Sequence, residues 1–219
     1  MKFLGWCAAV AAMGGVCAEA QVAEVRFGVA EFSEDFLNPG TERDNGVEQS
    51  VALQGEVVFE EPGFLKWALS PQPYINVTAN LEQNTSLAGA GLLWRQEVGE
   101  RVYADFAAGA SVHDGELEFG LGDFLPEGEL TQELFDTAFD QLFAARRSRR
   151  EFGSRVLIRA QATVGVRVSE DWAAEVFFEH HSNGSGSLFN RDPETFLEAA
   201  ELRENDAVDT LGLRAARRF

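Results

Sequence analysis

The sequence predicts an all-β fold, namely an antiparallel eight-stranded transmembrane β-barrel of the bacterial outer membrane. Three observations predict it: an N-terminal processing segment, period-two alternation of apolar and polar residues over most of the remaining chain, and connections that are short and long in turn. The formal net charge of -18 excludes nucleic acid as a partner, because a phosphate backbone needs a basic surface.

Residues 1–20, "MKFLGWCAAVAAMGGVCAEA", have the pattern of a secretory signal peptide. One lysine precedes an apolar run, and the segment ends in a small-x-small triplet, so we expect cleavage before Gln21. Cys7 and Cys17 would leave with this segment. The mature chain, residues 21–219, is therefore expected to form one barrel without disulfides or a cysteine-based metal site.

Eight segments alternate between an apolar and a polar face: 22–32, 50–59, 74–81, 87–94, 101–112, 155–168, 172–182 and 209–219. Their polar faces carry Arg, Asp, Glu and Gln in mid-strand, while their apolar faces run the full length. A transmembrane barrel needs this pattern, with apolar side chains toward lipid and polar side chains toward the lumen. A periplasmic β-sandwich is the alternative fold.

The connections agree with a barrel. The turns "QEVGER" and "SEDW" are short, whereas about residues 34–47, 114–152 and 183–207 form long loops. Bacterial barrels have short periplasmic turns and long outer loops. We therefore expect a long outer loop at about 114–152. The C-terminal residue also agrees with a barrel, because Phe219 is a common last residue of bacterial outer-membrane strands.

The seventh segment carries a polar pair on its apolar face. Its even positions run from Trp172 through Val176 and Phe178 to His180 and Ser182. With both termini periplasmic, this strand runs outward, so the pair is expected on the lipid-facing wall near the extracellular leaflet. Polar side chains facing lipid cost free energy, which favours a functional interpretation.

An acidic residue is expected beside this pair. Asp209 begins the last strand, next to the seventh strand and on the same outward face. A serine nucleophile needs a base, and the base needs an acid to hold its tautomer and charge, so the three side chains could form a triad acting on a lipid. His181 is expected to face the lumen in a structural role. No metal or other cofactor is expected, because His113 is the only other histidine.

The segment "FFEHHSNG" and the final "NDAVDTLGLRAARRF" resemble the lipid A 3-O-deacylase (PagL-type) family, and "FGSRVLIRAQATVGVRV" adds to the likeness. The resemblance implies an outer-membrane serine esterase that removes an ester-linked acyl chain from lipid A. It makes Ser182 the nucleophile and His180 the base, and Asn183 completes the motif. Lipid A in the outer leaflet would be the substrate.

The resemblance leaves two positions for the acid. Counting back from the C-terminus makes Asp209 the acid and Asn205 the oxyanion donor. Counting forward from the serine gives Glu194 and Asn190 instead. We prefer Asp209, because the last strand has a fixed length and a register that faces lipid.

The loop segment "LTQELFDTAFDQLFAARRSRREF" predicts an amphipathic helix. Its apolar residues at helical spacing are followed by four arginines that are candidates for binding lipid A phosphates: Arg146, Arg147, Arg149 and Arg150. Two interpretations stay open, an interfacial substrate-binding helix or an ordinary amphipathic loop helix.

Two other function classes remain beside the esterase. One is a non-catalytic small outer-membrane barrel with a structural or adhesion role, and the other is an outer-membrane phospholipase with the same triad. Substitution of Ser182 separates the enzymes from the non-catalytic barrel. The sequence predicts an integral outer-membrane location with the site at the outer leaflet, but it does not predict an oligomeric state.

Overall fold

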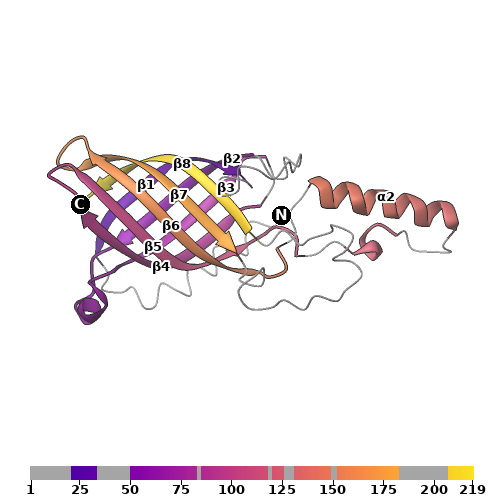
Figure 1. Cartoon of the computed structure of the whole chain (residues 1–219), viewed down its shortest axis with the longest axis horizontal. Coiled ribbons are helices and arrows are strands. Elements are labelled where there is room, and N and C mark those ends of the chain that lie inside the picture. The colour runs from indigo at the N-terminus through magenta and orange to yellow at the C-terminus, as the bar shows by residue number, and fades with distance from the viewer. Residues whose placement is uncertain are drawn as a thin grey trace.

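The computed structural model describes residues 21–33, 50–82, 85–117, 120–125, 131–148, 152–182 and 207–219. Eight strands close into a barrel in which each strand pairs antiparallel with its neighbour in the chain, and the last pairs with the first (Figure 1). The strands are β1 (Val22–Ser33), β2 (Ser50–Phe59), β3 (Gln72–Asn80), β4 (Leu87–Glu97), β5 (Val102–His113), β6 (Val156–Arg167), β7 (Trp172–Ser182) and β8 (Ala207–Arg218). The predicted fold and strand number are confirmed.

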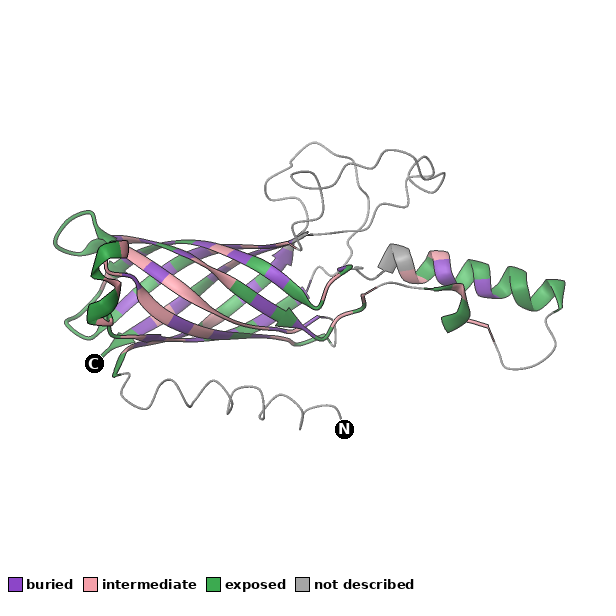
Figure 2. Ribbon diagram, turned by 90° about the horizontal axis from the view of Figure 1, so that it is seen from below, coloured by how far each residue is buried: buried purple, intermediate pink, exposed green. Residues whose placement is uncertain are grey.

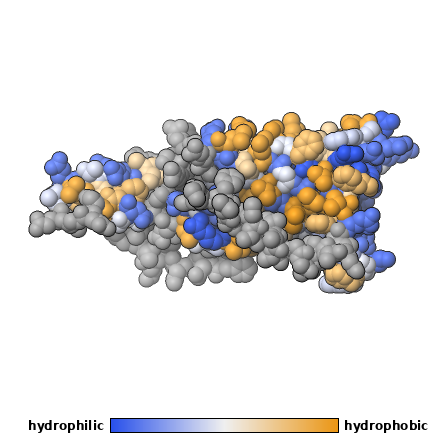
Figure 3. All heavy atoms as spheres, turned by 180° about the vertical axis from the view of Figure 1, so that it is seen from behind, coloured by the Kyte–Doolittle hydropathy of each residue, from blue (hydrophilic) through white to orange (hydrophobic). Residues whose placement is uncertain are grey.

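Side chains alternate between the wall and the lumen of the barrel, as the sequence predicts. Along β7, Trp172, Ala174 and Val176 are exposed, whereas Glu175 and Phe177 are buried. Figure 2 shows this alternation of buried and exposed positions along the strands, and Figure 3 shows apolar side chains across the barrel wall. The apolar residues thus face lipid, and the charged residues face inward.

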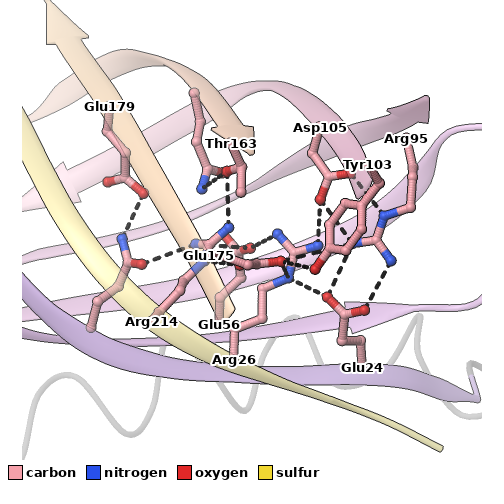
Figure 4. A network of polar contacts seen from close by, with 12 residues as sticks. Glu24, Arg26, Glu56, Arg95, Tyr103, Asp105, Thr163, Glu175, Glu179 and Arg214 are labelled. Atoms are coloured by element: carbon pink, nitrogen blue, oxygen red, sulfur yellow. Dashed lines mark hydrogen bonds and ion pairs between the residues drawn. The ribbon is translucent and has the colours of Figure 1, made fainter. Parts of the chain in front are cut away.

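The lumen is filled by ion pairs between strands (Figure 4). Arg26 lies at their centre, with its guanidinium 2.5 Å from Glu24, 3.0 Å from Glu56 and 2.7 Å from Asp105. Arg159 joins Glu56 to Glu179 in the same way, and Arg214 pairs with Glu175. An eight-stranded barrel is only wide enough for its interior to be filled by side chains, so these groups pack the core.

Both ends of the described chain lie at one end of the barrel, where the Phe219 amide donates to the Ala23 carbonyl at 3.1 Å. Two of the three turns at this end are short, 98–101 and 168–171. The third, residues 60–71, is longer and contains the 3-10 helix η2 (Gly63–Ala68). This turn, and the short 81–86 connection at the other end, depart from a strict alternation of short turns and long loops.

The segment between β5 and β6 lies at the end opposite the termini. It contains the short helix η3 (Leu121–Asp123) and the helix α2 (Gln132–Ser148), which extends beyond the barrel (Figures 1 and 2). The predicted loop helix is thereby confirmed. No helix in the part of the chain that the structure describes is long and apolar enough to cross a membrane. The expected signal peptide lies outside the described residues.

Candidate active site

His180 and Asp209 meet on the outer wall of the barrel, near the end opposite the termini. The β7–β8 register places them directly opposite each other. His180 Nδ1 lies 2.7 Å from Asp209 Oδ1. An ionised carboxylate can only accept, so this contact requires the tautomer in which the His180 Nδ1–H donates a hydrogen bond to Asp209. This arrangement leaves Nε2 as the imidazole nitrogen that can accept a proton from another group.

Ser182 lies two residues beyond His180 on the same face of β7, where it is the last residue of the strand. Residues two apart in a strand are separated by about 7 Å along the chain and point to the same side. On the neighbouring strands Ser182 pairs with Ile158 and Ala207. The structure thus places Ser182, His180 and Asp209 on the lipid-facing side of two adjacent strands, near the end opposite the termini.

Burial differs sharply between the histidine and the acid. The side chain of His180 is 36% exposed, whereas that of Asp209 is 7% exposed although it belongs to the outward face of β8. A buried carboxylate is costly unless it is hydrogen-bonded or paired, and here the imidazole supplies the partner. Asp209 therefore holds the ring in one orientation, while the exposed side of the ring stays open to a lipid.

His181 points into the lumen, as predicted from the alternation. Its Nε2 lies 3.3 Å from Glu179 Oε2, and Glu179 also pairs with Arg159. His113, the third histidine, packs on Phe152 at 4.2 Å between ring centroids and contacts the Ser154 carbonyl through Nε2. His181 and His113 thus each contact residues other than those of the His180–Asp209 pair. Among the described residues, no cluster of His, Cys, Asp or Glu could hold a metal ion.

Several predicted site residues lie outside the described part of the chain: Asn183, Asn190, Glu194, Asn205, Arg149 and Arg150. Arg146 and Arg147 belong to the last turns of α2, but only their backbone is described. Phe135, Phe139 and Phe143 form a row along this helix, with neighbouring ring centroids 6.0 and 4.8 Å apart. The proposed roles of all these groups remain predictions.

One feature near the termini was not anticipated. The indole nitrogen of Trp94, on the outer wall, donates to the Ala68 carbonyl at 2.9 Å and so ties η2 to the barrel. The signal available in the sequence was the pair of aromatic residues in "PGFLKWALSP", which stand in a connection rather than in a strand.

Comparison with known proteins gives one family. The family model described as lipid A 3-O-deacylase (PagL) matches residues 49–190, a span that includes His180 and Ser182 and ends before Asp209. A comparison with curated proteins gave no match.

Three solved structures are similar to the chain. The crystal structure of the outer membrane enzyme PagL has a TM-score of 0.49 at 10% identity, covering 90% of this chain and 100% of that one. A de novo designed transmembrane β-barrel has a TM-score of 0.46 at 9% identity, covering 92% and 98%. Neisserial surface protein A has a TM-score of 0.43 at 8% identity, covering 90% and 96%. The family match extends over more than half of the 219 residues, and the chain therefore belongs to the lipid A 3-O-deacylase (PagL) family of outer-membrane proteins.

Proposed function

We propose that this protein is a serine esterase that removes the 3-O-linked acyl chain of lipid A at the outer leaflet. In this mechanism Ser182 is the nucleophile, His180 is the general base and Asp209 is the acid that orients the base. The observation that carries the proposal is the 2.7 Å hydrogen bond from His180 Nδ1 to Asp209 Oδ1 on the lipid-facing wall, two residues from a serine.

In the first half of the reaction Ser182 is acylated, and His180 Nε2, the imidazole nitrogen that does not face Asp209, is the base. His180 Nε2 takes the proton of the Ser182 hydroxyl while Ser182 Oγ attacks the ester carbonyl, and the tetrahedral intermediate carries a negative oxygen. The positive charge on His180 is stabilised by Asp209. When the intermediate collapses, the bond to the sugar oxygen breaks, and that oxygen takes the proton from His180 Nε2. The acyl chain is then bound to Ser182 as an ester.

Deacylation repeats these steps with water. His180 takes a proton from the water as its oxygen attacks the acyl-serine carbonyl, and returns that proton to Ser182 Oγ as the fatty acid leaves. Asn205 is our choice for the oxyanion donor and Asn183 for a supporting amide, with Asn190 as the alternative. Arg146, Arg147, Arg149 and Arg150 are proposed to bind the lipid A phosphates, since guanidinium groups bind phosphate bidentately.

The outer leaflet is proposed because of the chain's topology. Barrels with an even number of strands and short periplasmic turns keep both termini in the periplasm. Ser182 and Asp209 lie at the opposite end of their strands from Trp172 and Arg217, which pair beside the C-terminus. A lipid in the outer leaflet would therefore have its head group and ester bonds level with this edge.

Mass spectrometry of lipid A tests the proposal directly. Cells that express the wild-type protein are expected to lose one ester-linked acyl chain from lipid A, and cells with Ser182→Ala are expected to keep it. Ser111→Ala is a matched control, because Ser111 is a buried serine of β5 whose side chain faces the lumen and not the lipid. Full activity in Ser182→Ala would contradict the assigned nucleophile.

The same cells separate the alternatives. A fatty acid released from phospholipid rather than from lipid A would assign the site to a phospholipase. Unchanged lipid A and phospholipid with the wild-type protein would assign the barrel a non-catalytic role. Each variant must first show the heat-modifiable gel mobility of a folded barrel, so that loss of activity is not loss of fold.

A further inference from the structure

The longest described turn at the terminal end of the barrel carries an unusual apolar surface. Residues 60–71 connect β2 to β3, and η2 within them has no buried residue. Phe64, Trp67 and Leu69 are 75%, 83% and 84% exposed, which makes them the three most exposed large apolar side chains among the described residues. Scattered exposed apolar residues are ordinary, but three large ones within six positions of one turn indicate a non-aqueous partner.

The turn is fastened to the wall of the barrel and does not hang free below it. Trp94 Nε1 donates to the Ala68 carbonyl at 2.9 Å, and the Trp94 ring packs beside Phe106 with centroids 6.2 Å apart. Both rings belong to the lipid-facing sides of β4 and β5. Figure 1 shows η2 as the purple coil to the side of the barrel end.

The backbone after η2 is bent into an uncommon conformation that supports this placement. Leu69 and Ser70 have φ values of 64° and 56°, in the left-handed region that non-glycine residues seldom adopt. Such conformations cost free energy and persist where surrounding contacts hold them. The bend brings the chain back to β3 with the side chains of Phe64, Trp67 and Leu69 outside.

A cluster of aromatic side chains lies on the outer wall at the same end of the barrel, on β1, on β7 and directly after β8. Phe27 and Trp172 pack edge to face with centroids 6.2 Å apart, and Arg217 lies over the rings of Trp172 and Phe219. Aromatic girdles of this kind mark the level where membrane meets water. Trp94 ties η2 to the lipid-facing side of β4, so the surface of the turn adjoins the lipid-facing wall.

We propose that the 60–71 turn, which contains η2, is a membrane-interface anchor whose Phe64, Trp67 and Leu69 insert into the phospholipid leaflet at the terminal end of the barrel. Lys66, exposed between Phe64 and Trp67, extends its ammonium group to the lipid head groups while its methylene chain covers apolar surface. The anchor resists vertical movement and tilting of the barrel in the bilayer. This proposed role does not depend on catalysis by the site at the opposite end of the barrel.

Spin labelling tests the anchor with little change to the protein, because the sequence has no cysteine after residue 20. Phe64→Cys and Trp67→Cys are labelled with a nitroxide in the folded barrel and reconstituted into phosphatidylethanolamine–phosphatidylglycerol vesicles. Gly99→Cys is the matched control, since Gly99 lies in the short 98–101 turn at the same end and a side chain there meets no atom within 4 Å.

We expect the labels at 64 and 67 to collide several-fold more with dissolved oxygen than with a water-soluble nickel chelate, relative to the label at 99. Oxygen concentrates in the bilayer and the chelate in water, so this ratio measures immersion. Labels at 64 and 67 that behave like the label at 99 would overturn the proposal. Labels at 64 and 67 that are accessible to the nickel chelate in vesicles but shielded from it in native outer membranes would also overturn the proposal, in favour of a protein partner.

Discussion

Asp209 faces outward on β8, yet its side chain is 7% exposed, because His180 lies against it. The partly exposed imidazole therefore separates the acid from the lipid phase. In the proposed mechanism, a carboxylate placed in this way acts through the base and does not contact substrate. Its replacement should consequently disturb the tautomer and charge of His180 more than it disturbs substrate binding.

We predict that Asp209→Asn lowers the overall rate of lipid A hydrolysis roughly a thousandfold while leaving the barrel folded. An amide can hold the His180 ring in the wrong tautomer and cannot stabilise the positive charge of that ring. Glu194→Gln, the matched change at the alternative acid, should stay near wild type. Rates on purified lipid A in detergent measure both. An inactive Glu194→Gln together with an active Asp209→Asn would transfer the role to Glu194.

At the scale of the strand, the alternation of side chains decides which residues a lipid can reach. Ala107 and Ala108 are adjacent in the middle of β5, but Ala107 is buried in the lumen, whereas Ala108 pairs with Ala160, which in turn pairs with His180. Ala108 therefore belongs to the same outward row as the proposed base.

Cysteine labelling measures this difference with residues of the same type. In vesicles, Ala108→Cys should react with a lipid-soluble maleimide, and Ala107→Cys should be protected by the packed lumen until the barrel is unfolded. The reverse pattern would place His180 and Ser182 on the luminal side and remove the argument for a lipid substrate.

The ring of Tyr103 explains why position 165 in β6 is a glycine. A Cβ atom on Gly165 of β6 would lie 2.2 Å from Tyr103 Cζ, and the Tyr103 hydroxyl donates to Glu175 at 2.6 Å. Gly165→Ala should destabilise the barrel by about 1–3 kcal/mol, because the ring must leave this position. Gly55→Ala, where a Cβ meets nothing within 4 Å, is the control and should unfold like wild type. Gel mobility after heating or urea gives both midpoints, and equal midpoints would contradict the packing argument.

At the scale of the whole molecule, the ion pairs of the lumen join strands that are far apart in the sequence. Arg26 on β1 contacts Glu56 on β2 and Asp105 on β5, and it has no solvent-exposed surface. A group of this kind holds the barrel closed only while its charges stay balanced, since an unpaired buried carboxylate is very costly.

We predict that Arg26→Met destabilises the barrel by about 3–5 kcal/mol, because Glu24, Glu56 and Asp105 lose a shared partner inside the lumen. Arg167→Met removes an arginine that pairs with the half-exposed Glu97 at the rim, and it should cost about 1 kcal/mol or less. Urea unfolding in detergent compares the two. Similar losses for both variants would mean that the luminal network adds little to stability.

Much of this architecture is a local property of the chain. Period-two alternation alone predicts the eight strands and their inner and outer faces, because consecutive side chains of a strand point to opposite sides. It also places His180, Ser182 and Asp209 on one face, and a hairpin register brings the last two strands together. The observed His180↔Asp209 pairing agrees with that register.

Only the tertiary structure decided which side chains meet across the barrel. The contacts of Arg26 with Asp105 and of Arg159 with Glu56 depend on how eight strands close and on the stagger between them, which no single segment specifies. The same holds for Trp94 and Ala68, since a turn of one hairpin meets the wall of the next. Local sequence sets the direction of each side chain, whereas closure of the barrel sets the distances between them.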